Sequence, residues 1–137
     1  MPPDPELVAE TRDWLDRAAD DLRAGELLLG AAPPLPVAAA FHAQQAAEKA
    51  LKAFLTWHGR PFRKTHDLAE IGGLCVAIDA TLNTPVRRAA VLSEFAWRFR
   101  YPGAPRPLGP AEAAEALGLA RAVYAAVVAR LPGEVRP

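Results

Sequence analysis

Residues 37–60, VAAAFHAQQAAEKALKAFLTWHGR, decide the fold of this 137-residue chain. Small and aromatic side chains recur in this stretch at three- and four-residue steps: Ala40, Ala43, Ala47, Ala50, Phe54 and Trp57. This spacing predicts an α-helix with one apolar stripe, and its small residues let a neighbouring helix approach closely. Gly59 and Pro61 predict the end of the helix.

Prolines divide the rest of the chain into segments of helix length. The fourteen prolines leave five proline-free stretches, which are 6–32, 37–60, 62–84, 86–101 and 111–131. Proline is tolerated in the first turn of a helix but not in its interior. Alanine, leucine, arginine and glutamate dominate these stretches and favour helix over strand. The sequence therefore predicts an all-α fold, an up-and-down bundle of four to five helices.

Capping residues predict where the individual helices begin and end. The expected boundaries are Asp4, Pro5 and Gly30 for the first helix, Asp67 and Ile78 for the third, Thr84 and Pro85 for the start of the fourth, and Pro110 and Leu131 for the fifth. Three large apolar residues, Leu92, Phe95 and Phe99, are expected to align on the fourth helix.

The length of the chain suits one hydrophobic core, because single domains usually have about 100–200 residues. We expect one domain over residues 1–137, with a core of about 5–131 and a proline-rich loop at 102–110. A single cysteine, Cys75, and the lack of an opening signal-peptide pattern predict a cytoplasmic protein. The longest uncharged run, 27–47, contains prolines and glutamines, so no membrane span is expected.

The net charge of zero excludes a protein that coats nucleic acid through a uniformly basic surface, and it excludes an acidic disordered tail. The charges are nevertheless segregated. Residues 1–30 hold eight acids and three bases, whereas 31–64 and 85–110 each hold five bases and one acid. Either the two positive segments face a common groove that attracts phosphate, or they neutralise the acidic first helix through intramolecular ion pairs.

Polar residues of the predicted second helix fall opposite its alanine stripe: His42, Gln45, Lys49 and Lys52. Glu48 lies beside large apolar residues, among them Phe41 and Leu55. This mixture indicates an interface or a lined cleft. The alternative is a bundle core with Glu48 at its rim.

Several motifs occur together with this helix in a fixed order. They are ADDL at 19–22, FHAQQAAEKALKA at 41–53, Gly59, THDL at 65–68 and RYP at 100–102. In this combination the chain resembles the HEPN domain over about residues 12 to 131. The resemblance implies a small helical bundle, homodimerisation, and the binding of nucleotide or RNA. Many relatives are encoded beside a minimal nucleotidyltransferase and act with it as a toxin–antitoxin pair.

The RNA-cleaving branch of that family uses an arginine, four to six intervening residues and a histidine in a dimer cleft. The cation stabilises the phosphorane, and the histidine transfers protons. No histidine follows His66, so the motif is missing from its usual place, here residues 98–103. Arg60 and His66 have the spacing but lie in a predicted loop. The sequence therefore favours a binding protein without catalytic residues over a metal-independent ribonuclease.

The expected nucleotide- or RNA-binding residues combine the resemblance with the charge pattern: Gln45, Glu48, Lys49, Lys52, His66, Arg100 and Tyr101. Arg100 suits a phosphate, Tyr101 suits stacking on a base, and the lysines supply charge. Alternatively, His66 caps a helix or bonds within the bundle, and Tyr101 belongs to a packed turn.

Other sites receive less support. The three histidines and Cys75 lack a convincing ligand spacing, so no metal site and no cofactor are predicted. A protein–protein interaction module without its own ligand is the alternative function, and the mixed face of the second helix is the observation that supports it.

Overall fold

The computed structural model describes residues 2–103 and 106–137. Within these residues the chain forms five α-helices, which are α1 (Pro5–Leu29), α2 (Pro36–Trp57), α3 (Leu68–Ile78), α4 (Asn83–Ala89) and α5 (Pro110–Ala129). Three short 3₁₀ helices accompany them, η1 (Ala80–Leu82), η2 (Ala90–Ala96) and η3 (Gly133–Val135). The described residues contain no strand, so the predicted all-α bundle is confirmed.

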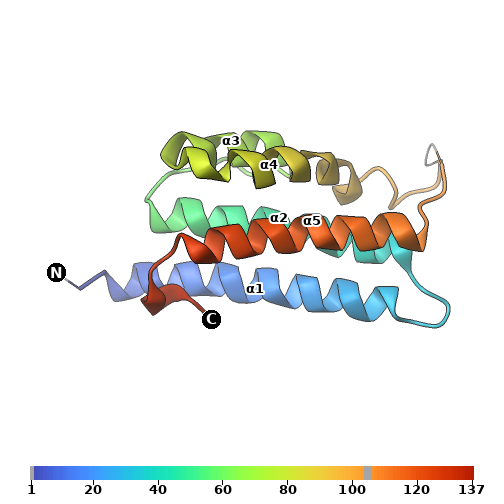
Figure 1. The fold of residues 1–137 in the computed structure, drawn as a ribbon, viewed down its shortest axis with the longest axis horizontal. Coiled ribbons are helices and arrows are strands. Elements are labelled where there is room, and N and C mark those ends of the chain that lie inside the picture. The colour runs from blue at the N-terminus through green and yellow to red at the C-terminus, as the bar shows by residue number, and fades with distance from the viewer. Residues whose placement is uncertain (1, 104–105) are drawn as a thin grey trace.

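Helix α2 lies at the centre of the bundle. Figure 1 shows α1 on one side, α2 and α5 in a middle layer, and α3 with α4 on the opposite side. α2 contacts α1 most extensively and also packs against α5, α3 and η2. Because α2 has neighbours on several sides, it must bury most of its circumference. This explains why the apolar side chains of α2 are distributed around most of the helix.

The alanine stripe of α2 is buried as predicted. Ala43, Ala47 and Ala50 have no exposed surface, and Phe54 is 1% exposed. Their small side chains let neighbouring helices approach, and Phe54 supplies the larger volume that fills the core. The core also includes Val135 of η3, which lies beyond the expected limit at residue 131.

Two predicted helix starts are confirmed by their caps. The Asp4 carboxylate accepts a hydrogen bond from the Glu6 amide at 3.0 Å, and Pro5 is the first residue of α1. Gly30 ends this helix. The Asp67 carboxylate accepts a hydrogen bond from the Ala69 amide at 3.0 Å, which caps α3.

The fourth helix differs from the prediction. Helix α4 begins at Asn83 and ends after seven residues, so Thr84 is not its cap and Pro85 lies inside its first turn. The chain then continues as η2. Leu92 and Phe95 still share the buried side, because a 3₁₀ helix has three residues per turn.

Gly72 explains how α3 packs closely against α4. A Cβ atom at this position would lie 2.3 Å from Cγ1 of Val86, a distance that atoms of real side chains do not reach. The glycine therefore permits this close contact, and a larger residue would require the Val86 side chain or the helices to shift.

The segment before α5 is only partly described. Residues 104 and 105 of the expected loop 102–110 lie outside the described residues, and α5 begins at Pro110. Among the described helices, none combines the length and the hydropathy needed to cross a membrane.

Candidate functional site

Glu48 is a buried carboxylate on α2, with 3% of its surface exposed. Its Oε1 accepts hydrogen bonds from Nδ1 of His66 at 2.7 Å and from Nε2 of Gln44 at 3.0 Å. Its Oε2 accepts from Nζ of Lys52 at 2.9 Å. We call these four residues the Glu48 cluster. It fastens the loop before α3 to the central helix, since Gln44 also donates to the His66 carbonyl at 3.2 Å.

Opposing effects act on the pKa of Glu48. Burial by itself raises this pKa, because it penalises the charged form. Hydrogen bonds from Lys52, His66 and Gln44, together with the positive charge of Lys52, outweigh burial and lower the pKa below its ordinary value. The carboxylate is therefore ionised at neutral pH, and Glu48 lies inside the bundle and not at its rim.

Lys52 is enclosed by the protein. Its ammonium group lies 5.6 Å from the ring centroids of both Trp14 and Phe62, and the residue is 9% exposed. The rings attract the cation, and Glu48 supplies its counter-ion. Gln45 joins the same region, because its Nε2 donates to Oε1 of Gln44 at 2.7 Å.

A second buried carboxylate connects α1 to α2. Asp21 is 8% exposed and pairs with Nδ1 of His42 at 2.8 Å and with Nζ of Lys49. We call these three residues the Asp21 cluster. Lys49 thus neutralises an acid of the first helix, as in the intramolecular alternative of the sequence analysis. Asp21 and His42 were not among the expected site residues, although both lie in the motifs at 19–22 and 41–53.

Several cations of the two positive segments are likewise paired within the chain. Arg63 binds Glu70 at 2.7 Å, and Arg98 binds Glu94 at 3.2 Å. Arg106 binds Glu112. These ion pairs leave much less free positive charge than the sequence count suggests.

Arg100 has no carboxylate partner within residues 2–103 and 106–137, and the same holds for Arg60, Lys64, Arg87 and Arg88. The aromatic contact of Arg100 and its place at a pocket distinguish it from these four. Its guanidinium carbon lies 4.1 Å from the ring centroid of Phe41, and its Nη1 donates to the Ala96 carbonyl at 3.3 Å. Stacking and one hydrogen bond thus orient the guanidinium while leaving most of its donors free.

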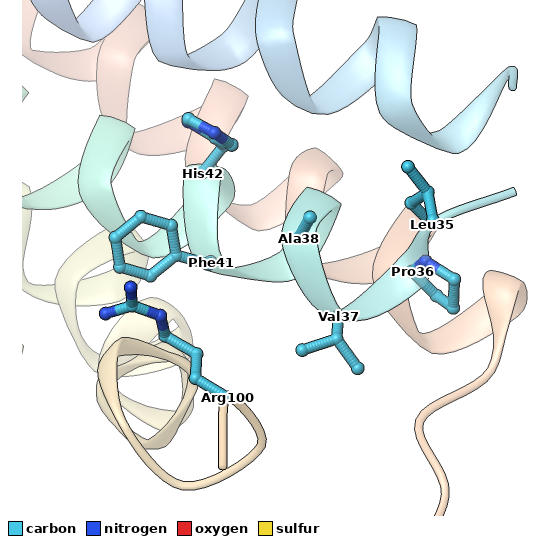
Figure 2. Close-up of a pocket in the computed structure, with 7 residues that line it drawn as sticks. All are labelled: Leu35, Pro36, Val37, Ala38, Phe41, His42 and Arg100. Atoms are coloured by element: carbon cyan, nitrogen blue, oxygen red, sulfur yellow. The ribbon is translucent and has the colours of Figure 1, made fainter.

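A pocket of about 570 Å³ opens between Arg100 and the first turns of α2 (Figure 2). We call it the Arg100 pocket; it is lined by Leu35, Pro36, Val37, Ala38, Phe41, His42 and Arg100. Its walls are mainly apolar, and His42 and Arg100 are the polar groups. The ring of His42 packs edge-on to Phe41 with the centroids 5.5 Å apart. His42 thereby connects the Asp21 cluster to the pocket.

The seven expected site residues fall into three places. Gln45, Glu48, Lys52 and His66 belong to or contact the Glu48 cluster, Lys49 belongs to the Asp21 cluster, and Arg100 lines the pocket. Tyr101 is 62% exposed, and its ring centroid lies 5.9 Å from the Arg100 guanidinium. Only Arg100 and Tyr101 of the seven are adjacent and available to an anion in solution.

His66 also lines a second surface groove of about 660 Å³. The groove lies between the start of α3 and η2, and it is lined by Thr65, His66, Asp67, Ala90, Val91, Ser93, Glu94 and Trp97. Arg60 is not one of these lining residues, so the two members of the weaker ribonuclease hypothesis do not line one groove here.

Metal and thiol chemistry receive no support from the described residues. They contain no group of three or more histidine, cysteine, aspartate or glutamate side chains that could hold a metal ion. Cys75 is buried, and its thiol contacts the Leu51 carbonyl at 3.5 Å. Burial raises the pKa of Cys75 to about 12, which keeps the thiol protonated and unreactive.

Comparisons with known proteins agree with this architecture. The family model for the HEPN domain matches residues 11–131. A crystal structure of TT1696 from Thermus thermophilus is similar to the chain, with a TM-score of 0.74 and 34% sequence identity over 88% of this chain and 98% of that chain. The comparison with curated proteins found no match. Because the family model covers most of the chain, the chain belongs to the HEPN domain family.

Proposed function

We propose that this HEPN-family protein binds a nucleotide or RNA in the Arg100 pocket and acts as a homodimer beside a minimal nucleotidyltransferase, in a pair of the toxin–antitoxin type. The observation that supports binding is the guanidinium of Arg100, which has no carboxylate partner among the described residues and is held over Phe41 at the edge of an apolar pocket. The family membership supports the partnership.

The chemistry of the pocket suits a phosphate attached to a flat apolar group. A guanidinium presents parallel N–H donors that match two phosphate oxygens. Val37 and Ala38 provide apolar wall for a base or ribose, and His42 adds a second polar group. Since Nδ1 of His42 is held by Asp21, its Nε2 is the nitrogen left for a ligand. Binding of a single nucleotide at such a pocket does not need a broadly basic surface.

Lys49 and the Glu48 cluster have a different role in this proposal. Lys49 binds Asp21, which in turn orients His42, so Lys49 is a positioning residue. Glu48, Lys52 and their partners fix the central helix that carries Phe41. Substituting these residues changes the site through the fold.

Titration of the purified full-length chain with AMP, ATP and a short single-stranded RNA tests the proposal, at several salt concentrations. Arg100→Ala is expected to weaken binding by about tenfold, the effect of losing one charge-assisted contact. It also reduces the number of released counter-ions by about one for RNA. Arg98→Ala is the matched control, because Arg98 pairs with Glu94 and lies outside the pocket. Equal affinities for the native chain and Arg100→Ala exclude this site.

A protein–protein interaction module remains the second candidate, and a different observation now supports it. The mixed face of α2 is covered by α1, α3, α5 and η2 of the same chain, so it no longer indicates a partner. Exposed apolar side chains support a partner instead: Leu35, which lines the Arg100 pocket, is 50% exposed, and Trp97, which lines the second groove, is 62% exposed.

Co-expression with a minimal nucleotidyltransferase encoded beside this chain tests whether the two proteins form a complex. Leu35→Asp is expected to reduce recovery of the complex, and Leu27→Asp is the control, since Leu27 is 64% exposed and does not line the Arg100 pocket. The mass of the isolated chain by light scattering tests the homodimer. A monomer at every concentration contradicts it.

A further inference from the structure

The Glu48 cluster holds an exposed histidine in a fixed orientation. His66 keeps 63% of its side chain exposed, although its Nδ1 is bound at 2.7 Å by a carboxylate that is 5% exposed. The same carboxylate receives Gln44 and Lys52, so it cannot turn away. A histidine that served only to fill the bundle would be buried. His66 is instead oriented by the buried Glu48 carboxylate and lines a surface groove.

The orientation determines which nitrogen a ligand meets. An ionised carboxylate only accepts hydrogen bonds, so Nδ1 of His66 carries the hydrogen that it donates to Glu48. In the neutral ring Nε2 then carries a lone pair, and no described residue donates to it. The groove therefore presents an acceptor that is aimed by a buried carboxylate.

Glu94 presents a second acceptor in the same groove. Its Oε2 accepts a hydrogen bond from Arg98 at 3.2 Å, while its Oε1 accepts none within the described residues. The cation nearest to that oxygen is Nη2 of Arg106, at 4.0 Å. Glu94 is thus already a guanidinium-binding carboxylate, and its Oε1 is paired only with Arg106 at 4.0 Å, without a hydrogen bond among the described residues.

Trp97 adds a flat aromatic surface beside these acceptors. It lines the groove and is 62% exposed, and Val91 on the same wall is 57% exposed. No lysine or arginine is among the lining residues, whereas Asp67 and Glu94 are. A planar cation can stack on an indole ring while its N–H groups bind acceptors at its edge.

We propose that the groove between His66 and Trp97 binds an arginine side chain displayed by a partner protein. The guanidinium stacks on Trp97 and donates to Nε2 of His66 and to Oε1 of Glu94, where it displaces the 4.0 Å ion pair with Arg106. The exposed Val91 and Trp97 extend the contact to the residues on either side of that arginine, which favours a protein partner over a free amino acid. This site is separate from the Arg100 pocket and independent of the function proposed for it.

The test uses the full chain and short peptides with a central arginine, lysine or citrulline. Nitrogen resonances of the His66 ring and of the Trp97 indole report on the groove itself. The arginine peptide is expected to shift both signals saturably. The neutral citrulline peptide is expected to bind about tenfold more weakly, as for the loss of one charge-assisted contact. Equal affinity for the citrulline or the lysine peptide overturns the proposal.

Three variants examine the individual contacts. Glu94→Gln is expected to weaken the arginine peptide by about tenfold. Arg106→Ala is expected to tighten it, because the cation that faces Oε1 of Glu94 at 4.0 Å is removed; a merely structural Glu94 would not produce this gain. Arg100→Ala is the control, and its affinity for the peptide is expected to be unchanged. Failure of Arg106→Ala to tighten binding, or of Glu94→Gln to weaken it, overturns the assignment of Glu94.

Two further outcomes identify the source of the ligand. If N-acetylarginine amide binds as tightly as the peptide, the proposed protein partner is wrong. If AMP shifts the His66 and Trp97 signals and the arginine peptide does not, the groove belongs to a nucleotide site and the proposal fails. Loss of AMP binding in Arg100→Ala with normal peptide binding separates the two sites.

Discussion

Replacing Glu48 by glutamine tests the central ion cluster most directly. The variant keeps the size of the side chain but removes the counter-ion of Lys52. Lys52 is 9% exposed and pairs with no other carboxylate among the described residues. Breaking a buried pair by removing one partner costs about 3–5 kcal/mol. Lys52 retains two aromatic rings at 5.6 Å, so we expect the lower end, about 3 kcal/mol. For a chain of this size that corresponds to a fall in Tm of roughly 10 °C.

The pH dependence gives the same experiment a second readout. The pKa of Glu48 is lower in the folded state than its ordinary value of 4.5. Its ionised form therefore stabilises the native chain at pH values above 4.5, and this contribution is lost as the pH falls through the lowered pKa. We expect the difference in unfolding free energy between the native chain and Glu48→Gln to be largest near pH 7 and to shrink in acid.

Urea unfolding followed by circular dichroism at pH 7 and in acid measures both effects. Glu10→Gln is the matched control, since Glu10 is an exposed residue of α1 and a change there is expected to stay within about 0.5 kcal/mol. A loss below about 1 kcal/mol for Glu48→Gln at pH 7 would refute the view that the cluster supports the fold. A difference that is equally large in acid would refute the pKa argument.

Three further predictions concern single positions. Gly72→Ala is expected to destabilise the chain by about 1–3 kcal/mol, because its Cβ would lie 2.3 Å from Val86, and adding Val86→Ala should recover part of that loss in a double-mutant cycle by urea unfolding. Cys75 is expected to resist alkylation at pH 8 until the chain unfolds, since burial raises its pKa to about 12; rapid labelling of the native chain contradicts this. Asp21→Asn is expected to lower stability by about 1–3 kcal/mol in thermal unfolding by leaving Lys49 without its counter-ion, and an unchanged Tm argues against the cluster.

The helices that the sequence predicted well are those with local signals. The Asp4 cap, the position of Pro5 and the apolar stripe from Ala40 to Trp57, of which Trp57 is only partly buried, all depend on residues within a few turns of one another. The 3₁₀ helix η2 depends on distant contacts instead. Ser93 of η2 accepts a hydrogen bond from the Leu68 amide at 2.9 Å, which satisfies a free donor at the start of α3. No local pattern announces such a contact between residues 25 positions apart.

In the candidate site, too, some features follow from local sequence and others depend on distant contacts. Periodicity placed Glu48, Lys49 and Lys52 on one helix, but their roles depend on which elements that helix faces. Lys49 meets Asp21, a residue 28 positions away on α1, so its charge is used inside the protein. Arg100 has no such partner among the described residues and remains available. Composition predicted segregated charge, and only the packing shows which of those charges face solvent.

The two buried carboxylates also determine the axial position of α2. An alanine-rich surface is smooth, and a helix of this kind can slide or rotate against its neighbours with little loss of contact. A shift of one turn would separate Lys49 from Asp21 and His66 from Glu48, leaving charges buried without partners. The Asp21 cluster therefore connects α2 to α1, and the Glu48 cluster connects α2 to the loop before α3. Together with large core residues such as Phe54, the two clusters favour a single register for α2.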